Sequence, residues 1–117
     1  MTAIVGTKMK PLYFENHHID CIGQEHKYTL YVSYMEDTDK RVIGYIQYTT
    51  LQNDLYVDYV EVKEELRRNG IGKSLYKKLY ELNSDCSFQE SGYYTELGSC
   101  IRKWFNKEVL SVKTTNI

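Results

Sequence analysis

The sequence predicts an α/β or α+β fold in which a mostly antiparallel sheet carries at least two helices, and its length of 117 residues favours one domain spanning 1–117. Two patterns support this prediction. Consecutive segments in the first half alternate between apolar and polar residues and are separated by short polar turns, which is typical of strands. In the second half, apolar residues recur at the spacing of a helix.

The first clear strand pattern is YTLYVSYM, at residues 28–35. It is rich in aromatic and β-branched residues, which favour strands. Because side chains alternate along a strand, one face is expected to carry Tyr28, Leu30, Val32 and Tyr34.

Two further strands are predicted after polar turns. EDTDKR leads into VIGYIQYTTL at 42–51, and QND leads into LYVDYVEV at 55–62. Gly44 falls inside the second strand, where a glycine often accompanies a bulge or the close approach of another group. Strands joined by such short turns are expected to form an antiparallel meander.

The spacing changes to a helical one after the third strand. Ile71, Leu75, Leu79 and Leu82 fall on one side of a helix predicted over about 72–82.

The C-terminal part predicts one more helix and two strands. CSFQE at 86–90 is interpreted as a short fourth strand, TELGSCIRKWFNKE at 95–108 as a helix, and VLSVKTT at 109–115 as a last strand. The apolar stripe of that helix contains Ile101, Trp104 and Phe105.

Residues 1–27 show no clear period, although Ile4 and Val5 are consistent with the start of a strand. The residues in this part with metal-binding side chains are His17, His18, Cys21 and His26. Their spacing fits no closed zinc pattern, so we expect no metal. We interpret this part as a polar loop or short helix.

Composition and charge exclude several classes of protein. A net charge of −1 argues against general nucleic-acid binding. No apolar run approaches the ~18 residues of a membrane span, and the N-terminus lacks the long apolar centre of a signal peptide. The 3 cysteines, an odd number at wide spacing, favour free thiols in a reducing cytosol, so we expect a cytoplasmic protein with no membrane partner.

The stretch RRNGIGK, from Arg67 to Lys73, forms a cationic glycine turn between a strand and a helix. The first turn of a helix has unpaired N–H groups and a dipole that favours negative charge, and glycines let a phosphate approach closely. We therefore expect a ligand that carries phosphate. A P-loop would need glycine at Arg67 and a dinucleotide fingerprint would need it at Leu75, so neither motif is complete.

The segment YVDYVEVKEELRRNGIGKSLYKKLYEL, at 56–82, resembles the signature of the GNAT superfamily of N-acetyltransferases. That signature is a strand ending in Val, a few acidic or polar residues, Arg/Gln-x-x-Gly-x-Gly/Ala, and an amphipathic helix. RVIGYIQY at 41–48 matches the preceding strand, and WFNKEVLSV at 104–112 is a looser version of the last helix and strand. The resemblance covers 28–82 well and 86–112 loosely.

The resemblance implies acetyl-coenzyme A as cosubstrate and a mixed, mostly antiparallel GNAT-like sheet. Backbone amides from Arg68 to Lys73 would bind its pyrophosphate, and the pantetheine arm would pair with a bulged strand that parts from its neighbour near 86–90. The implied cofactor-binding residues are Val60, Glu61, Val62, Arg67, Arg68, Asn69, Gly70, Ile71, Gly72 and Lys73.

An amine attacks a thioester only when it is neutral, so a base is expected. The candidates are Asp58, Glu61 and Glu90, and spacing does not choose between them. Simple alternation puts Asp58 on the Val60 side of its strand, unless a bulge resets the register.

The general acid of the family is a tyrosine in its last helix, and Phe105, without a hydroxyl, aligns there. Tyr93 or Tyr94 is a substitute, or no acid is present. A thiol leaving group with a pKa of ~8.5 departs without much protonation, so the reaction can proceed without a general acid.

The family places two helices between its first two strands, and only about twenty residues are available for this reduced N-terminal helical region. We therefore expect an open acceptor site, suited to a primary amine on a protein or peptide. The compact size is similar to that of small phage-encoded acetyltransferases, which also favours a protein target. The alternative is a non-catalytic GNAT-like protein that binds coenzyme A or a partner protein.

Overall fold

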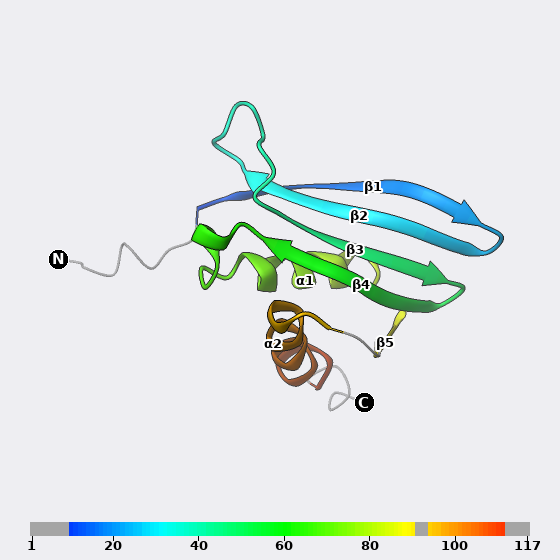
Figure 1. Cartoon of the computed structure of the whole chain (residues 1–117). Helices are drawn as coiled ribbons and strands as arrows, with labels where there is room; N and C mark the ends of the chain where they lie inside the picture. Colours follow the sequence, from blue (N-terminus) through cyan, green and yellow to red (C-terminus); the bar gives the residue numbers. More distant parts are fainter. Residues whose placement is uncertain (1–9, 91–93, 112–117) are drawn as a thin grey trace.

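A five-stranded sheet with the strand order β1-β2-β3-β4-β5 forms one layer, and two helices pack against one of its faces (Figure 1). The computed structural model describes residues 10–90 and 94–111. The strands are β1 (Leu12–Ile22), β2 (Glu25–Tyr34), β3 (Gly44–Leu51), β4 (Asp54–Val62) and β5 (Ser87–Gln89). The helices are α1 (Ile71–Leu82) and α2 (Glu96–Phe105). Neighbouring strands from β1 to β4 are antiparallel and β5 is parallel to β4, which confirms the predicted fold class.

The meander of β2, β3 and β4 buries one face against the helices. Leu30 pairs with Ile46, which pairs with Val60, and all three side chains are buried in the same apolar core. Gly44 begins β3, and a Cβ atom there would lie 3.0 Å from the carbonyl oxygen of Glu61. The predicted reason for this glycine, the close approach of another group, is therefore confirmed. The opposite face of the sheet is called the open face below, because neither α1 nor α2 covers it.

The N-terminal segment differs from the prediction. Residues 12–22 form the edge strand β1 instead of a polar loop or short helix, and a turn at Gly23, with φ of +63°, joins β1 directly to β2. No helix lies between β1 and β2. The strand was hidden in the sequence because most of it is exposed on both faces, so it has little apolar alternation. The proposed strand start at Ile4 and Val5 lies outside the described residues.

Helix α1 covers the core face of the sheet with the predicted stripe. Ile71, Leu75 and Leu79 are buried, whereas Leu82 in the last turn stays 46% exposed and does not belong to the core. Tyr76 joins the buried side of the helix.

Helix α2 begins at the cap residue Thr95, whose hydroxyl accepts a hydrogen bond of 3.0 Å from the Gly98 amide. Ile101 and Phe105 are buried, as predicted. The last strand predicted from residue 109 is wrong where it can be compared, because Asn106–Leu110 continue α2 as a π-helical turn. Val109 and Leu110, at the end of this turn, pack against the core. Residues 112–115 of the predicted strand lie outside the described residues.

Candidate active site at the parting of β4 and β5

Strand β4 is bulged in its middle and parts from β5 after a short parallel contact. Gln47 pairs with Tyr59 and Tyr48 pairs with Val57, so Asp58 is an extra residue without a partner on β3. On its other side, β4 pairs with β5 only over Asp54–Tyr56. The main chain of β4 beyond residue 56 therefore has no strand partner on the β5 side among the described residues.

The bulge also resets the alternation of side chains along β4. Val57 and Val60 both face the core, and Asp58 and Tyr59 are both exposed. Asp58 therefore does not share a face with Val60. This is the exception stated with the sequence prediction, because the extra residue of a bulge shifts the period by one.

A narrow cleft of about 30 Å³ separates this part of β4 from the helices. Its lining residues are Val57, Asp58, Tyr59, Val60, Tyr76, Tyr94, Thr95 and Gly98. Gly98 is the point where α2 faces the strand, since a Cβ atom there would lie 3.4 Å from Cγ1 of Val60, an ordinary van der Waals contact.

The cationic glycine turn lies at the start of α1. Arg68 and Gly70 both have positive φ, +70° and +83°, and this reversal leads the chain into the helix. No side chain of the described residues caps the N-terminus of α1, so its first amides remain available to a ligand. A cavity of about 90 Å³ adjoins this turn and is lined by Val62, Arg67, Arg68, Gly70, Ile71, Gly72, Lys73, Leu97 and Ile101.

Gly72 has a packing role that the sequence did not predict. A Cβ atom at this position would overlap with Cδ1 of Ile101, so the glycine is needed for α1 to meet α2. Asn69, another residue of the turn, donates a side-chain hydrogen bond of 3.2 Å to the carbonyl oxygen of Leu66.

Arg67 ties the turn to the end of β4. It donates hydrogen bonds to the carbonyl oxygen of Val62 at 3.0 Å and to the carboxylate of Glu61 at 2.8 Å. Glu61 is therefore engaged by a guanidinium, and it does not line the cleft at the bulge.

Asp58 connects the cleft to a wider groove on the open face. Thr49, which is buried, donates a hydrogen bond of 2.6 Å from its hydroxyl to the Asp58 carboxylate, and Lys27 approaches the same hydroxyl at 3.3 Å. The groove has a volume of about 510 Å³. It is lined by Glu25, Lys27, Thr49, Leu51, Tyr56, Val57, Asp58 and Glu90.

Glu90 and Tyr94 lie together beside the cleft. The Tyr94 hydroxyl donates to Glu90 at 3.0 Å, and Asn106 donates to the other carboxylate oxygen at 3.0 Å. The guanidinium of Arg102 lies 3.5 Å from the same carboxylate. The other candidate acid, Tyr93, lies outside the described residues.

Phe105 and Tyr76 pack ring against ring deep in the site. The ring centroids are 4.9 Å apart and both side chains are fully buried. Tyr76 was not singled out from the sequence as a candidate site residue. The sequence did contain a signal for this residue. Tyr76 falls on the buried side of α1, where the other large side chains are hydrocarbons and a hydroxyl group is unexpected.

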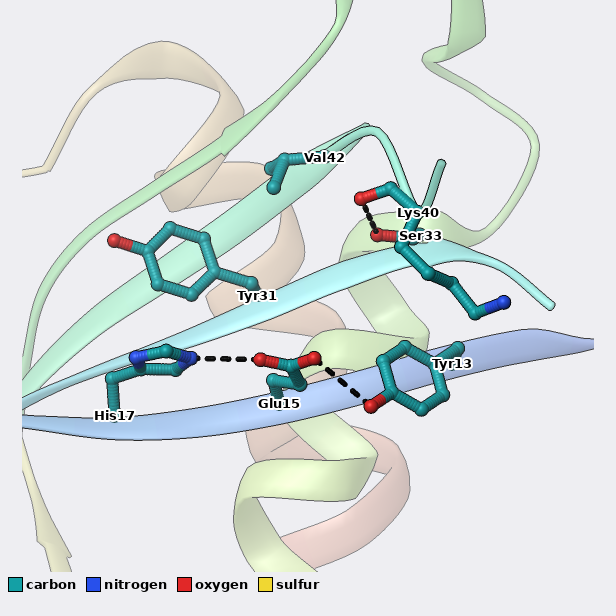
Figure 2. A pocket seen from close by; sticks show the side chains of 7 residues that line it. All are labelled: Tyr13, Glu15, His17, Tyr31, Ser33, Lys40 and Val42. Atoms are coloured by element: carbon teal, nitrogen blue, oxygen red, sulfur yellow. Dashed lines mark hydrogen bonds and ion pairs between the residues drawn. The ribbon is translucent and has the colours of Figure 1, made fainter. Parts of the chain in front are cut away.

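Another cavity, of about 310 Å³, lies on the open face beside β1 and β2 (Figure 2). Its carboxylate, Glu15, accepts hydrogen bonds of 2.9 Å from both Tyr13 and His17, and these bonds hold the pKa of Glu15 below its usual value. The whole lining is Tyr13, Glu15, His17, Tyr31, Ser33, Lys40 and Val42.

The other histidines lie at the β1–β2 hairpin. Nε2 of His18 and Nδ1 of His26 are 3.1 Å apart, and Sγ of Cys21 is 3.9 Å from Nε2 of His26. Within residues 10–90 and 94–111, no group of three or more His, Cys, Asp or Glu side chains is arranged to hold a metal ion. In the same part of the chain, no helix has the length and apolar character required to cross a membrane.

The family model for the acetyltransferase (GNAT) family matches residues 4–98. The chain therefore belongs to the GNAT family of acetyltransferases, and this membership supports acyl transfer as its class of reaction.

One solved structure supports this fold. An acetyltransferase of the GNAT family from Streptococcus pneumoniae aligns with a TM-score of 0.53 at 17% identity, over 87% of this chain and 91% of that one. A protein of the same family from Bacteroides thetaiotaomicron aligns with a TM-score of 0.48 at 22% identity, over 75% of this chain and 47% of that one. The comparison with curated proteins found no match.

Proposed function

We propose that the chain transfers an acetyl group from acetyl-coenzyme A to a primary amine on a protein or peptide. The observation that carries this proposal is the position of Asp58, which lines both the narrow cleft beside β4 and the open acidic groove. A donor in the cleft and an acceptor in the groove would meet at this residue.

The residues around the glycine turn fit the donor. Arg68 and Lys73 would neutralise its diphosphate, and the first amides of α1 would donate hydrogen bonds to it. The main chain of Val60, Glu61 and Val62 has no strand partner on the cleft side among the described residues, so it would pair with the pantetheine arm. The cleft of about 30 Å³ is far smaller than a typical ligand cavity, so we expect β4 and α2 to part on binding.

The groove suits a cationic acceptor. Among the described residues that line it, the carboxylates are Glu25, Asp58 and Glu90, and the one ammonium group, on Lys27, lies 3.7 Å from the Glu25 carboxylate. An alkylammonium group would be attracted to this surface and would give up a proton to Asp58 before it attacks. Since no helix lies between β1 and β2, the groove is open enough for an extended polypeptide.

Thermal unfolding with acetyl-coenzyme A, coenzyme A and ATP tests the donor site. A ligand at 100 times its dissociation constant adds ~2.7 kcal/mol, which raises the melting temperature by several degrees in a domain of this size. We expect both coenzyme A species, and not ATP, to stabilise the chain. Arg68→Glu combined with Lys73→Glu should remove that stabilisation, and the matched reversal Lys103→Glu, on the exposed surface of α2 outside this cavity, should retain it.

Release of coenzyme A thiol in the presence of amines then tests turnover. We expect faster release with lysine-containing peptides than with the same peptides carrying acidic neighbours, because the groove is acidic. Binding of coenzyme A without turnover across a broad panel of amines and proteins would favour the non-catalytic alternative. Full binding by the doubly reversed variant would contradict the placement of the diphosphate.

A further inference from the structure

The hydroxyl of Tyr76 is an unpaired polar group at the wall of the narrow cleft. The side chain is 0% exposed, and its hydroxyl has no hydrogen-bond partner among the described residues. Buried hydroxyls are nearly always paired, and an unpaired one costs about 1–3 kcal/mol. The cleft that Tyr76 lines also contains the bulge of β4.

Packing alone does not account for this hydroxyl. The ring of Tyr76 lies against that of Phe105, and a phenylalanine at position 76 would make the same ring contact without a buried polar atom. The hydroxyl therefore lowers the stability of the unliganded protein, and a ligand atom in the cleft would remove that cost.

The Arg102 guanidinium acts on this hydroxyl with a positive charge, and the Glu90 carboxylate, 3.5 Å from the guanidinium, partly offsets that charge. Arg102 is only 3% exposed, and its Nη1 atom also lacks a hydrogen-bond partner among the described residues. Its Nε donates a hydrogen bond of 2.9 Å to the side-chain oxygen of Asn106, and its Nη2 donates one of 3.1 Å to the carbonyl oxygen of Gln89. These two bonds fix the position of the guanidinium. Burial raises the pKa of Tyr76 to about 12, against a smaller lowering by Arg102, so the phenol keeps its proton and can donate it in a hydrogen bond.

We propose that the Tyr76 hydroxyl donates a hydrogen bond to the sulfur of the acyl thioester and stabilises the thiolate that leaves. This inference rests on the proposed function. As the amine nitrogen bonds to the carbonyl carbon, the carbon–sulfur bond breaks and its electron pair goes to sulfur. Asp58 first passes to solvent the proton that it took from the ammonium group, and then accepts the proton that nitrogen loses as the amide forms. Tyr76 keeps its own proton, and the released thiolate takes one from solvent.

The ionisation of the bound coenzyme A thiol measures this hydrogen bond without any turnover. Ultraviolet absorbance of the thiolate is titrated against pH for coenzyme A bound to the unaltered chain, to Tyr76→Phe and to Tyr80→Phe. Tyr80 is the matched control, because it lies one turn further along α1, packs against Phe105 and Phe88, and does not line the cleft.

We expect the pKa of the bound thiol to be about one unit higher in Tyr76→Phe than in the unaltered chain, and unchanged in Tyr80→Phe. A difference of about one unit is the size expected for the loss of one hydrogen bond to a charged group. Tyr76→Phe should unfold at the same or a higher temperature and should still bind coenzyme A.

Equal thiol pKa values in all three proteins, or loss of coenzyme A binding in Tyr76→Phe, would overturn this role for Tyr76 and leave the proposed function standing. Failure of the unaltered chain to bind coenzyme A would overturn the proposed function, and this inference with it.

Discussion

Asp58 is the residue at which the two parts of the candidate site meet. The bulge leaves it unpaired on β3, and the hydroxyl of Thr49 fixes its carboxylate through a hydrogen bond of 2.6 Å. The other two candidate bases are held by cationic or amide groups, Glu61 by Arg67 and Glu90 by Asn106. Of the three, Asp58 alone lines both the cleft and the groove.

Asp58→Asn should lower the rate of acetyl transfer by about 10²–10⁴-fold, the usual contribution of a general base. Because the substitution preserves size, stabilisation by coenzyme A should be unchanged. Thr49→Val should cause a smaller loss, since it removes only the group that orients the carboxylate. Thiol release measured against pH checks both. A comparable loss in Glu90→Gln or Glu61→Gln, with Asp58→Asn still active, would assign the base to one of those residues instead.

Spacing alone could predict the glycine turn as a candidate site, because the motif is local in sequence. It could not rank the bases, since the bulge that turns Asp58 outward is a property of pairing with β3. It could not identify the Tyr76 hydroxyl either, because whether a buried phenol has a partner depends on side chains from α2. Candidate site residues could therefore be proposed from sequence where the expected chemistry is in the backbone, and not where it depends on tertiary contacts.

At the scale of elements, the contact between α1 and α2 depends on a glycine that also belongs to the ligand-binding turn. In a helix, replacing glycine by alanine normally adds about 1 kcal/mol of stability. At Gly72 the new Cβ atom would overlap with Cδ1 of Ile101, so the packing cost opposes that gain.

Gly72→Ala should therefore destabilise the chain by up to about 2 kcal/mol, measured by urea unfolding, because a packing cost of about 1–3 kcal/mol exceeds or matches the helical gain of about 1 kcal/mol. Ile101→Val removes the Cδ1 atom itself and should cost about 0.5–1.5 kcal/mol alone. In the double variant the two costs should not add, and a coupling of at least about 0.5 kcal/mol is expected. Additive costs would contradict direct packing of Gly72 on Ile101.

The meander was predictable because each of its strands has one buried face, which imposes a period of two on the sequence. The edge strand β1 lacks that constraint, and its exposed histidines and acids conceal it. The apolar residues after α2 were taken for a strand because a short apolar run fits either structure. Their packing against the core as a π-helical turn depends on where α2 ends.

At the scale of the whole molecule, the cleft lies between β4 on one side and α1 and the start of α2 on the other. The antiparallel strands β1 to β4 pair over most of their lengths, whereas β5 joins them over only Asp54–Tyr56. Helix α2 lies next to β4 (Figure 1). A Cβ atom at Gly98 in α2 would lie 3.4 Å from Cγ1 of Val60 in β4. The proposed function requires this contact to open, because a cleft of about 30 Å³ does not hold a pantetheine arm.

A reversible disulfide across this contact tests that requirement. The Cβ position of residue 98 lies 3.4 Å from Cγ1 of Val60, so Val60→Cys and Gly98→Cys place two thiols within bonding reach. In a background with Cys21, Cys86 and Cys100 replaced by serine, the oxidised double variant should lose stabilisation by coenzyme A, and reduction should restore it. Each single cysteine variant controls for the substitutions themselves. If the oxidised protein binds coenzyme A as well as the reduced one does, the arm does not enter between β4 and α2.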